Sequence, residues 1–201
     1  MSKQKARNIL LDCERMKYPH TGLYHFCLQL GHALIRNSNV NKEKIAFYLP
    51  AATGKIFGEH AEYIAQNSLH KFLFPPVSKY DIWHGTYQGS HYIPAGSSVK
   101  KVLTIHDLNF LYEHEERAEK IKRSLRKIQK QIDRADKICT ISAYVKKDVQ
   151  GHLDLKGKTV DVIYNGCNIQ HHANLQSPAI MPGKPFIFTI GTITTKKNFH
   201  V

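Results

Sequence analysis

The sequence predicts an α/β fold with a Rossmann-like, mostly parallel sheet that carries helices on both faces. Two observations lead to this prediction. Short apolar runs rich in β-branched residues alternate along the chain with segments of helical periodicity, which is typical of successive β-α-β units. Polar side chains also follow several of these runs directly, as expected where parallel strands end and ligands collect.

The expected elements follow in order along the chain. Apolar runs predict strands at residues 8–13, 44–49, 69–74, 80–84, 99–106, 137–141 and 160–164. Periodic apolar positions predict a helix that begins at Gly22 and ends near Asn37. Further helices are expected over residues 57–66, 115–135 and 143–153, the last capped by Ser142.

The end of the chain has a different character. Residues 170–184 contain His, Asn, Ser, Pro and Gly without periodicity, which is typical of a linker. Residues 185–190 are a new apolar run and predict a strand without sheet partners of its own. We therefore expect a first domain over residues 1–168, an interdomain linker over 169–184, and a truncated start of a second domain over 185–201.

Composition limits the classes of protein to consider. The 201 residues are 42% hydrophobic and 22% charged, which fits a globular domain and argues against disorder. No apolar run is long enough to span a bilayer, and the first residues lack the features of a signal peptide. The four cysteines show no C-x-x-C spacing, so we expect reduced structural thiols and no metal site. Together these features predict a cytoplasmic protein.

Positive charge dominates the ionisable residues, with 29 basic and 16 acidic side chains giving a net charge of +13. Such a surface attracts phosphates on lipids, nucleotides or nucleic acid. Much of the charge falls on the helix expected over residues 115–135, whose other side is apolar. That charged side is either simply solvated or a patch for anionic lipid or an anionic acceptor at the inner face of a membrane. Aromatic residues are not interleaved with it, so a nucleic-acid partner is disfavoured.

Three candidate site residues follow the apolar runs. Gly22 stands at a strand–helix junction, where backbone can approach an anion held by the helix N-terminus. The full G-x-G-x-x-G fingerprint is absent, so no nicotinamide or flavin dinucleotide site is predicted. His106 can hydrogen-bond a sugar hydroxyl or a phosphate, and Asp107 either orients the imidazole or caps the next turn. A structural role without any ligand stays open for all three.

A fourth candidate is the lysine pair Lys196 and Lys197, within the segment GTITTKKN at residues 191–198. Lysines at a strand-to-helix turn, beside free backbone N–H groups, suit a diphosphate. Two lysines in a loop are commonly only solvated, so the motif carries little weight alone.

Taken in order, these pieces resemble the retaining glycosyltransferase family 4, which has the GT-B fold. The resemblance rests on Gly22 and on four motifs: IHDL at 105–108, ADKICTISAYVKKDV at 135–149, VDVIYNGCN at 160–168, and FTIGTITTKKN at 188–198. Each motif is short, but their order and spacing make the signal fairly specific.

The resemblance implies a reaction. A hexosyl group, with mannosyl as the favoured guess, would pass from a sugar nucleotide to a saccharide or lipid-linked acceptor with retained configuration. The donor would bind mainly to the C-terminal domain and the acceptor mainly to the N-terminal domain. No metal or other cofactor is implied, because helix N-termini and basic side chains would stabilise the leaving diphosphate.

The resemblance also suggests roles for single residues. His106 would contact the transferred sugar near the reacting centre and is the candidate catalytic residue. Gly22 and Asp107 would bind substrate, with Gly22 near the phosphates, and Asn165 and Gly166 would shape the crossing between domains. Lys197 matches the lysine that holds the donor diphosphate.

One departure concerns the donor phosphates: Thr192 stands where many relatives carry arginine, and Lys196 would have to supply that charge. A second departure is that the family's donor-binding glutamates would fall beyond Val201, so we expect no transfer by these 201 residues alone. Two rival interpretations stay open, a non-enzymatic basic module that binds anionic membrane or a partner subunit, and a nucleic-acid binder.

Overall fold

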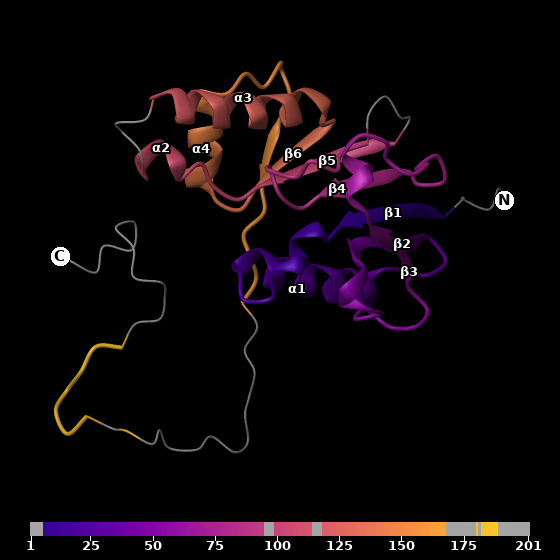
Figure 1. Ribbon diagram of the computed structural model, residues 1–201, viewed down its shortest axis with the longest axis horizontal. Coiled ribbons are helices and arrows are strands. Elements are labelled where there is room, and N and C mark those ends of the chain that lie inside the picture. Colours follow the sequence, from indigo (N-terminus) through magenta and orange to yellow (C-terminus); the bar gives the residue numbers. More distant parts are fainter. Residues whose placement is uncertain (1–5, 95–98, 114–117, 168–179, 181, 189–201) are drawn as a thin grey trace. The chain divides into compact units, whose positions relative to one another are not determined.

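The computed structural model describes residues 6–94, 99–113, 118–167, 180 and 182–188. The chain divides into two compact units, Met1–Asn165 and Gly166–Val201. The first unit is built on a seven-stranded sheet in which all neighbouring strands are parallel (Figure 1). The strands are β1 (Arg7–Asp12), β2 (Glu43–Pro50), β3 (Glu62–Gln66), β4 (Ile82–Gly85), β5 (Lys100–Ile105), β6 (Lys137–Thr140) and β7 (Val160–Val162). The predicted α/β class is confirmed, with a wholly parallel sheet.

The spatial order of the strands is β3-β2-β1-β4-β5-β6-β7. The chain starts in the middle of the sheet at β1 and proceeds outward through β2 to β3. It then returns to the other side of β1 with β4 and continues outward to β7. The order therefore reverses between β1 and β4, and in open α/β sheets ligands bind at such a reversal, beyond the carboxyl ends of the strands.

Helices cover both faces of the sheet, as predicted. Helix α1 (Gly22–Asn37) lies on one face, and α3 (Ala118–Arg134) and α4 (Ala143–His152) lie on the other (Figure 1). On the α1 face, Leu11 and Phe47 of the sheet pack with Cys27. On the opposite face, Leu103 packs with Ile132. Shorter helical segments are η1 (Glu14–Lys17), η2 (Ala51–Thr53), η3 (Ser68–Lys71) and α2 (Phe110–Glu113).

A third core cluster is aromatic and is closed by loops. Tyr48, Trp83 and Tyr92 are buried there, and Phe74 packs against them. Trp83 pairs in register with Lys101, and side chains alternate along a strand, so Trp83 and Leu103 point to the same face. The aromatic cluster therefore lies on the face that also carries α3.

The helix predicted over residues 57–66 is wrong. Residues 62–66 form strand β3 instead, paired with residues 46–50 of β2. Phe57 stacks on Phe47 with ring centroids 3.9 Å apart and fits under α1 where Gly31 has no side chain. A Cβ at Gly31 would lie 2.4 Å from the Phe57 ring. The apolar positions that suggested one helix thus divide into Phe57, which packs in the core, and residues 62–66, which form an edge strand.

The strand predicted over residues 69–74 is also wrong. Residues 68–71 form the short helix η3, which Asn67 caps by accepting a hydrogen bond from the Leu69 N–H at 2.9 Å. Of the apolar residues in this run, Phe74 packs into the core, while Leu69, Phe72 and Leu73 are exposed. A local cap competes successfully with a strand because β3 already completes this side of the sheet.

The predicted strand at 185–190 is not formed over its described part. Residues 185–188 have no regular secondary structure, and residues 189 and 190 lie outside the described residues. A single strand has no ladder to satisfy its backbone N–H and C=O groups, which accounts for this difference. Within the part of the chain that is described, no helix is long and apolar enough to cross a membrane.

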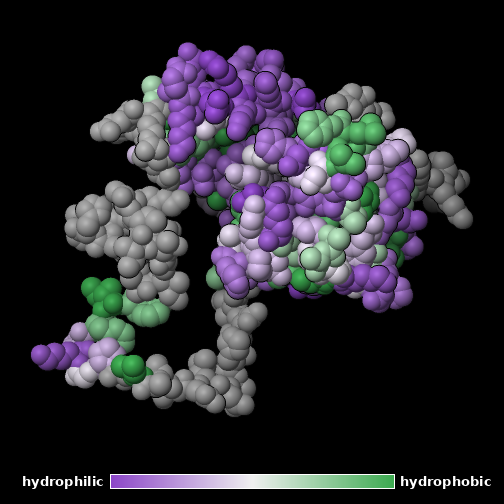
Figure 2. All heavy atoms as spheres, in the orientation of Figure 1, coloured by the Kyte–Doolittle hydropathy of each residue, from purple (hydrophilic) through white to green (hydrophobic). Residues whose placement is uncertain are grey.

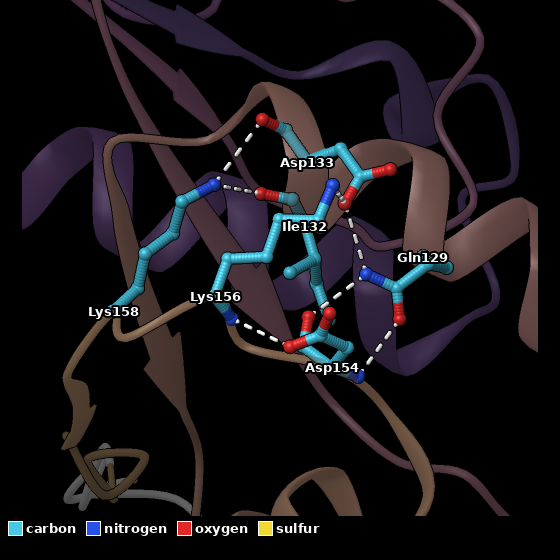
Figure 3. Close-up of polar contacts among 6 residues, drawn as sticks. All are labelled: Gln129, Ile132, Asp133, Asp154, Lys156 and Lys158. Atoms are coloured by element: carbon cyan, nitrogen blue, oxygen red, sulfur yellow. Dashed lines mark hydrogen bonds and ion pairs between the residues drawn. The ribbon is translucent and has the colours of Figure 1, made fainter.

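A polar cluster joins the end of α3 to the loop between α4 and β7 (Figure 3). Gln129 donates to the carbonyl of Asp154 at 2.8 Å and accepts from its N–H at 2.9 Å. Lys158 donates from Nζ to the carbonyls of Ile132, at 2.6 Å, and Asp133. The lysine thus adds a charged donor to two carbonyls in the last turn of the helix and complements the negative end of the helix dipole.

Replacement of Lys158 with methionine should lower the free energy of unfolding by about 1 to 2 kcal/mol. The methionine keeps most of the aliphatic stem but leaves two α3 carbonyls without their charged donor. Urea denaturation followed by circular dichroism measures the change. Lys130→Met, on the exposed side of the same helix, is the matched control, and an equal loss in both variants would contradict the assigned role of Lys158.

Candidate functional site

The carboxyl ends of β1, β4 and β5 meet where the strand order reverses. Register pairs Asp12 at the end of β1 with Gly85 at the end of β4, and Gly85 with Leu103 of β5. His106 and Asp107 follow β5 directly. The structure thus brings together the predicted residues His106 and Asp107, with Asp12 and the residues that follow β4.

Thr86 connects the ends of these strands. Its hydroxyl donates to the Asp12 carbonyl at 2.6 Å, and its own carbonyl accepts from His106 Nε2 at 2.8 Å. The Cys27 sulfur of α1 lies 3.3 Å from the same hydroxyl. Thr86 is 1% exposed, so these bonds are shielded from water. The end of β4 therefore fixes β1, α1 and the histidine in one arrangement.

His106 is held in a defined position and tautomer. A backbone carbonyl only accepts hydrogen bonds, so Nε2 carries the proton given to Thr86. In the neutral ring, the Nδ1 atom then has a lone pair and can accept a hydrogen bond. The ring edge also packs on Phe26 of α1, with centroids 4.6 Å apart at 86°. This arrangement suits the binding of a hydroxyl hydrogen.

Electrostatics favour a neutral His106. Burial lowers the pKa of His106 and outweighs the opposing effects of the Thr86 carbonyl and the Asp107 charge. The neighbouring His84 accepts or donates a 2.8 Å bond with Thr104, and burial followed by the His106 charge lowers its pKa to about 4. Both imidazoles are therefore uncharged near pH 7, and neither supplies a fixed positive charge to the site.

Gln88, in the loop after β4, hydrogen-bonds to the backbone of His106 and Asp107. Its Oε1 accepts from the His106 N–H at 3.1 Å, and its Nε2 donates to the Asp107 carbonyl at 2.9 Å. The side chain is buried, with 6% exposure. Sequence reasoning missed this residue, because a glutamine between two apolar runs carries no signal of such a long-range contact.

Replacement of Gln88 with alanine should lower the free energy of unfolding by about 1 to 3 kcal/mol, because two backbone groups lose their partner in a site with little water. It should also shift the Phe26 ring resonances, since the histidine backbone is no longer held beside α1. Urea titration and aromatic NMR spectra measure the two effects. Gln150→Ala, at an exposed position of α4, is the control, and unchanged Phe26 resonances in Gln88→Ala would contradict the positioning role.

Asp12 is a buried carboxyl group in the same cluster. It is 1% exposed and accepts hydrogen bonds from the Glu14 N–H at 3.0 Å and the Ser90 hydroxyl at 2.8 Å. Burial is the main cause that raises its pKa from 3.8 to about 7, and these hydrogen bonds only partly oppose it. The group therefore changes its protonation near neutral pH.

The raised pKa of Asp12 has an effect on stability opposite in sign to that of His84. The stability due to Asp12 is complete below pH 4 and is lost as the pH rises to about 7, because the folded state binds its proton more tightly. The lowered pKa of His84 destabilises the fold as the pH falls from 6.5 to about 4, because the unfolded chain then binds the proton more tightly. Between pH 4 and 6.5 the two contributions offset each other.

Replacement of Asp12 with asparagine should therefore expose the His84 contribution. The free energy of unfolding should rise with pH between 4 and 6.5, more steeply than in the unmodified protein. At pH 8 the variant should be more stable by up to ~4 kcal/mol, the equivalent of a shift of about three pKa units. Urea midpoints measured across this range test the prediction, with the exposed Asp161→Asn as control. Parallel pH profiles for Asp12→Asn and the unmodified protein would contradict it.

The other predicted residues are placed as follows. Gly22 is the first residue of α1, after the cap residue Thr21, and a Cβ added there would meet no described atom within 4 Å. Among the described atoms, the space beside Gly22 is thus open. Asp107 accepts from the Asn109 N–H at 3.3 Å, as expected for the turn that begins α2, and the described contacts show no bond from its carboxylate to the imidazole.

Of the remaining candidates, only Asn165 belongs to the first unit. Asn165 is exposed, three residues beyond β7, and Gly166 begins the second unit. Lys196 and Lys197 lie outside the described residues. Among the residues that the structure describes, no group of three or more His, Cys, Asp or Glu side chains is suited to hold a metal ion.

Comparison with known proteins identifies the class. The family model described as Glycosyltransferase Family 4 matches residues 58–171, which is more than half of the chain. No match is found among curated proteins. The matched region includes β3 to β7, and both Gln88 and His106 lie within it. The chain therefore belongs to glycosyltransferase family 4, and its activity is of the glycosyltransferase type, with a sugar donor and an acceptor as partners.

Proposed function

We propose that the chain forms the acceptor-side half of a retaining GT-B glycosyltransferase. The enzyme would transfer a hexosyl group from a sugar nucleotide to a glycan or lipid-linked acceptor. The observation that carries the proposal is the anchored, neutral His106 at the strand-order reversal, with Nδ1 left as an acceptor. Membership in glycosyltransferase family 4 supports the reaction type.

In this proposal, His106 accepts a hydrogen bond from a hydroxyl of the transferred sugar and so positions its anomeric carbon. The open space beside Gly22 would let the diphosphate approach the backbone N–H groups at the start of α1, which favour an anion. The acceptor oxygen attacks from the side that the diphosphate leaves, and a phosphate oxygen takes the acceptor proton. Bond formation and departure on the same face retain the configuration.

The second unit would supply the donor side. Lys196 and Lys197 would neutralise the leaving diphosphate, which needs no metal in this scheme. Asn165 and Gly166 would shape the crossing between the two halves, and Asp107 would support the substrate side through the turn that it caps. A mannosyl donor and a cytoplasmic location complete the proposal.

Replacement of His106 with alanine in the full-length gene product should lower kcat/KM for the cognate sugar nucleotide by about 100-fold, which corresponds to ~2.7 kcal/mol of transition-state stabilisation. In the unmodified enzyme, the acid limb of the pH profile should lie below pH 6.5, because the neutral imidazole is required and its pKa is lowered. A panel of sugar nucleotides with product detection by mass spectrometry measures both.

His60→Ala, which changes an exposed histidine in the loop before β3, is the matched control. Turnover that is equal in His106→Ala and in this control would refute the role of His106. A complete absence of transfer and hydrolysis with every donor would refute the enzyme and favour a non-enzymatic basic module.

A further inference from the structure

An exposed group of apolar side chains follows β3. Leu69, Phe72 and Leu73 are 68%, 90% and 80% exposed, and we call these three residues the apolar tip. Single exposed apolar residues are common on proteins, but three within five residues form a patch that calls for a partner. The core does not need these side chains, because Phe74 alone of this run packs into it.

The apolar tip is held outward by its surroundings. Asn67 caps η3, and His70 Nδ1 lies 3.1 Å from the Tyr48 hydroxyl, which joins this short helix to β2. On the other side of the tip, Phe74 meets the Trp83 ring edge-on with centroids 5.0 Å apart. Anchors on both sides therefore fix the exposed position of the three side chains.

The apolar tip lies on the same face of the sheet as α3. Its anchors Tyr48 and Trp83 belong to the aromatic cluster of that face. The loop after β4 joins the two regions, because Gln131 of α3 donates to the Ser90 carbonyl at 2.8 Å. Tyr92 lies two residues further along this loop, and the Lys71 Nζ of η3 is 5.8 Å from its ring centroid.

Helix α3 presents a strongly basic outer surface on this face. The helix contains seven basic and two acidic residues, and one of the acidic residues, Asp133, is paired with Lys156 of the loop between α4 and β7. The basic side chains exposed along it are Lys120, Lys122, Arg123, Arg126, Lys127, Lys130 and Arg134. Figure 2 shows hydrophilic atoms over α3 with hydrophobic side chains gathered beside them.

We propose that the apolar tip and the basic surface of α3 together dock the protein on an anionic lipid bilayer. Apolar side chains enter the boundary between head groups and acyl chains, while lysines and arginines attract the anionic head groups. Apolar insertion alone or electrostatic attraction alone binds a membrane weakly, and the two together on one face give peripheral attachment without a spanning segment. A nucleic-acid partner would use the charge but not Leu69, Phe72 and Leu73. The proposal goes beyond the transfer reaction and does not depend on it.

Co-sedimentation with vesicles tests this surface directly. The full chain should bind vesicles that contain phosphatidylglycerol and should bind pure phosphatidylcholine vesicles much more weakly. Replacement of both Phe72 and Leu73 with serine should weaken binding to the anionic vesicles about tenfold or more. Arg126→Gln combined with Lys130→Gln should weaken it to a similar degree and reduce its dependence on salt.

Val40→Ser is the matched control, because Val40 is 76% exposed but lies in the loop before β2, at the amino end of the strands, whereas the apolar tip follows the carboxyl end of β3. Circular dichroism verifies that each variant is folded. Absence of binding by the unmodified chain would overturn the proposal. Unchanged binding by the serine variant, or equal binding to neutral and anionic vesicles, would overturn it as well.

A fluorescence measurement locates the inserted residues independently. The single tryptophan of the chain, Trp83, is 1% exposed, so brominated lipids should not quench it. In Phe72→Trp, the new indole should be quenched by brominated acyl chains on anionic vesicles. Lack of quenching while the protein is vesicle-bound would show attachment through another surface and overturn the role of the apolar tip.

Discussion

The pairing of β4 with β1 is the constraint on which the candidate site depends. This pairing reverses the strand order and brings residues that are more than 70 positions apart into one hydrogen-bonded group. The buried residue Thr86 then binds the end of β1 through its hydroxyl and holds the Nε2-protonated tautomer of His106 through its carbonyl. Because the carboxyl ends of parallel strands lie together, the same pairing also places the first turns of α1 against the histidine, where Phe26 packs on His106.

Electrostatics within this group follow from burial more than from ion pairs. Burial raises the pKa of Asp12 to about 7 and lowers that of His84 to about 4. A carboxyl group that is only partly ionised and two neutral imidazoles thus share the region near neutral pH. A low fixed charge suits recognition of sugar hydroxyls, while basic side chains are concentrated on α3, on the outer surface of the protein.

The outer surface on the α3 side combines two properties that are separate in the sequence. The apolar tip follows β3, and the basic helix follows β5; the loop after β4 accepts a hydrogen bond from Gln131 of the helix and lies near Lys71, beside the tip. Their common face results from side-chain alternation across the sheet, which directs Tyr48, Trp83 and Leu103 to the same side. An acceptor carried by a lipid would require an enzyme that stays close to the bilayer, so this surface and the proposed reaction are compatible.

Much of the fold was determined by the sequence alone. Apolar runs correctly predicted β1, β2, β4, β5, β6 and β7, and helical periodicity correctly predicted α1, α3 and α4, because burial on one or two faces imposes these patterns directly. His106 and Asp107 could be recognised because they follow a clear strand, and the motifs around them indicated the family.

Only the tertiary structure decided the rest. Residues 62–66 form an edge strand, because β2 has backbone groups free to pair with them, and residues 68–71 form a capped short helix, because Asn67 supplies a local hydrogen bond. Gln88, Thr86 and Asp12 act through contacts between distant segments, and such contacts depend on strand order, which a pattern of apolar and polar residues along one chain does not contain.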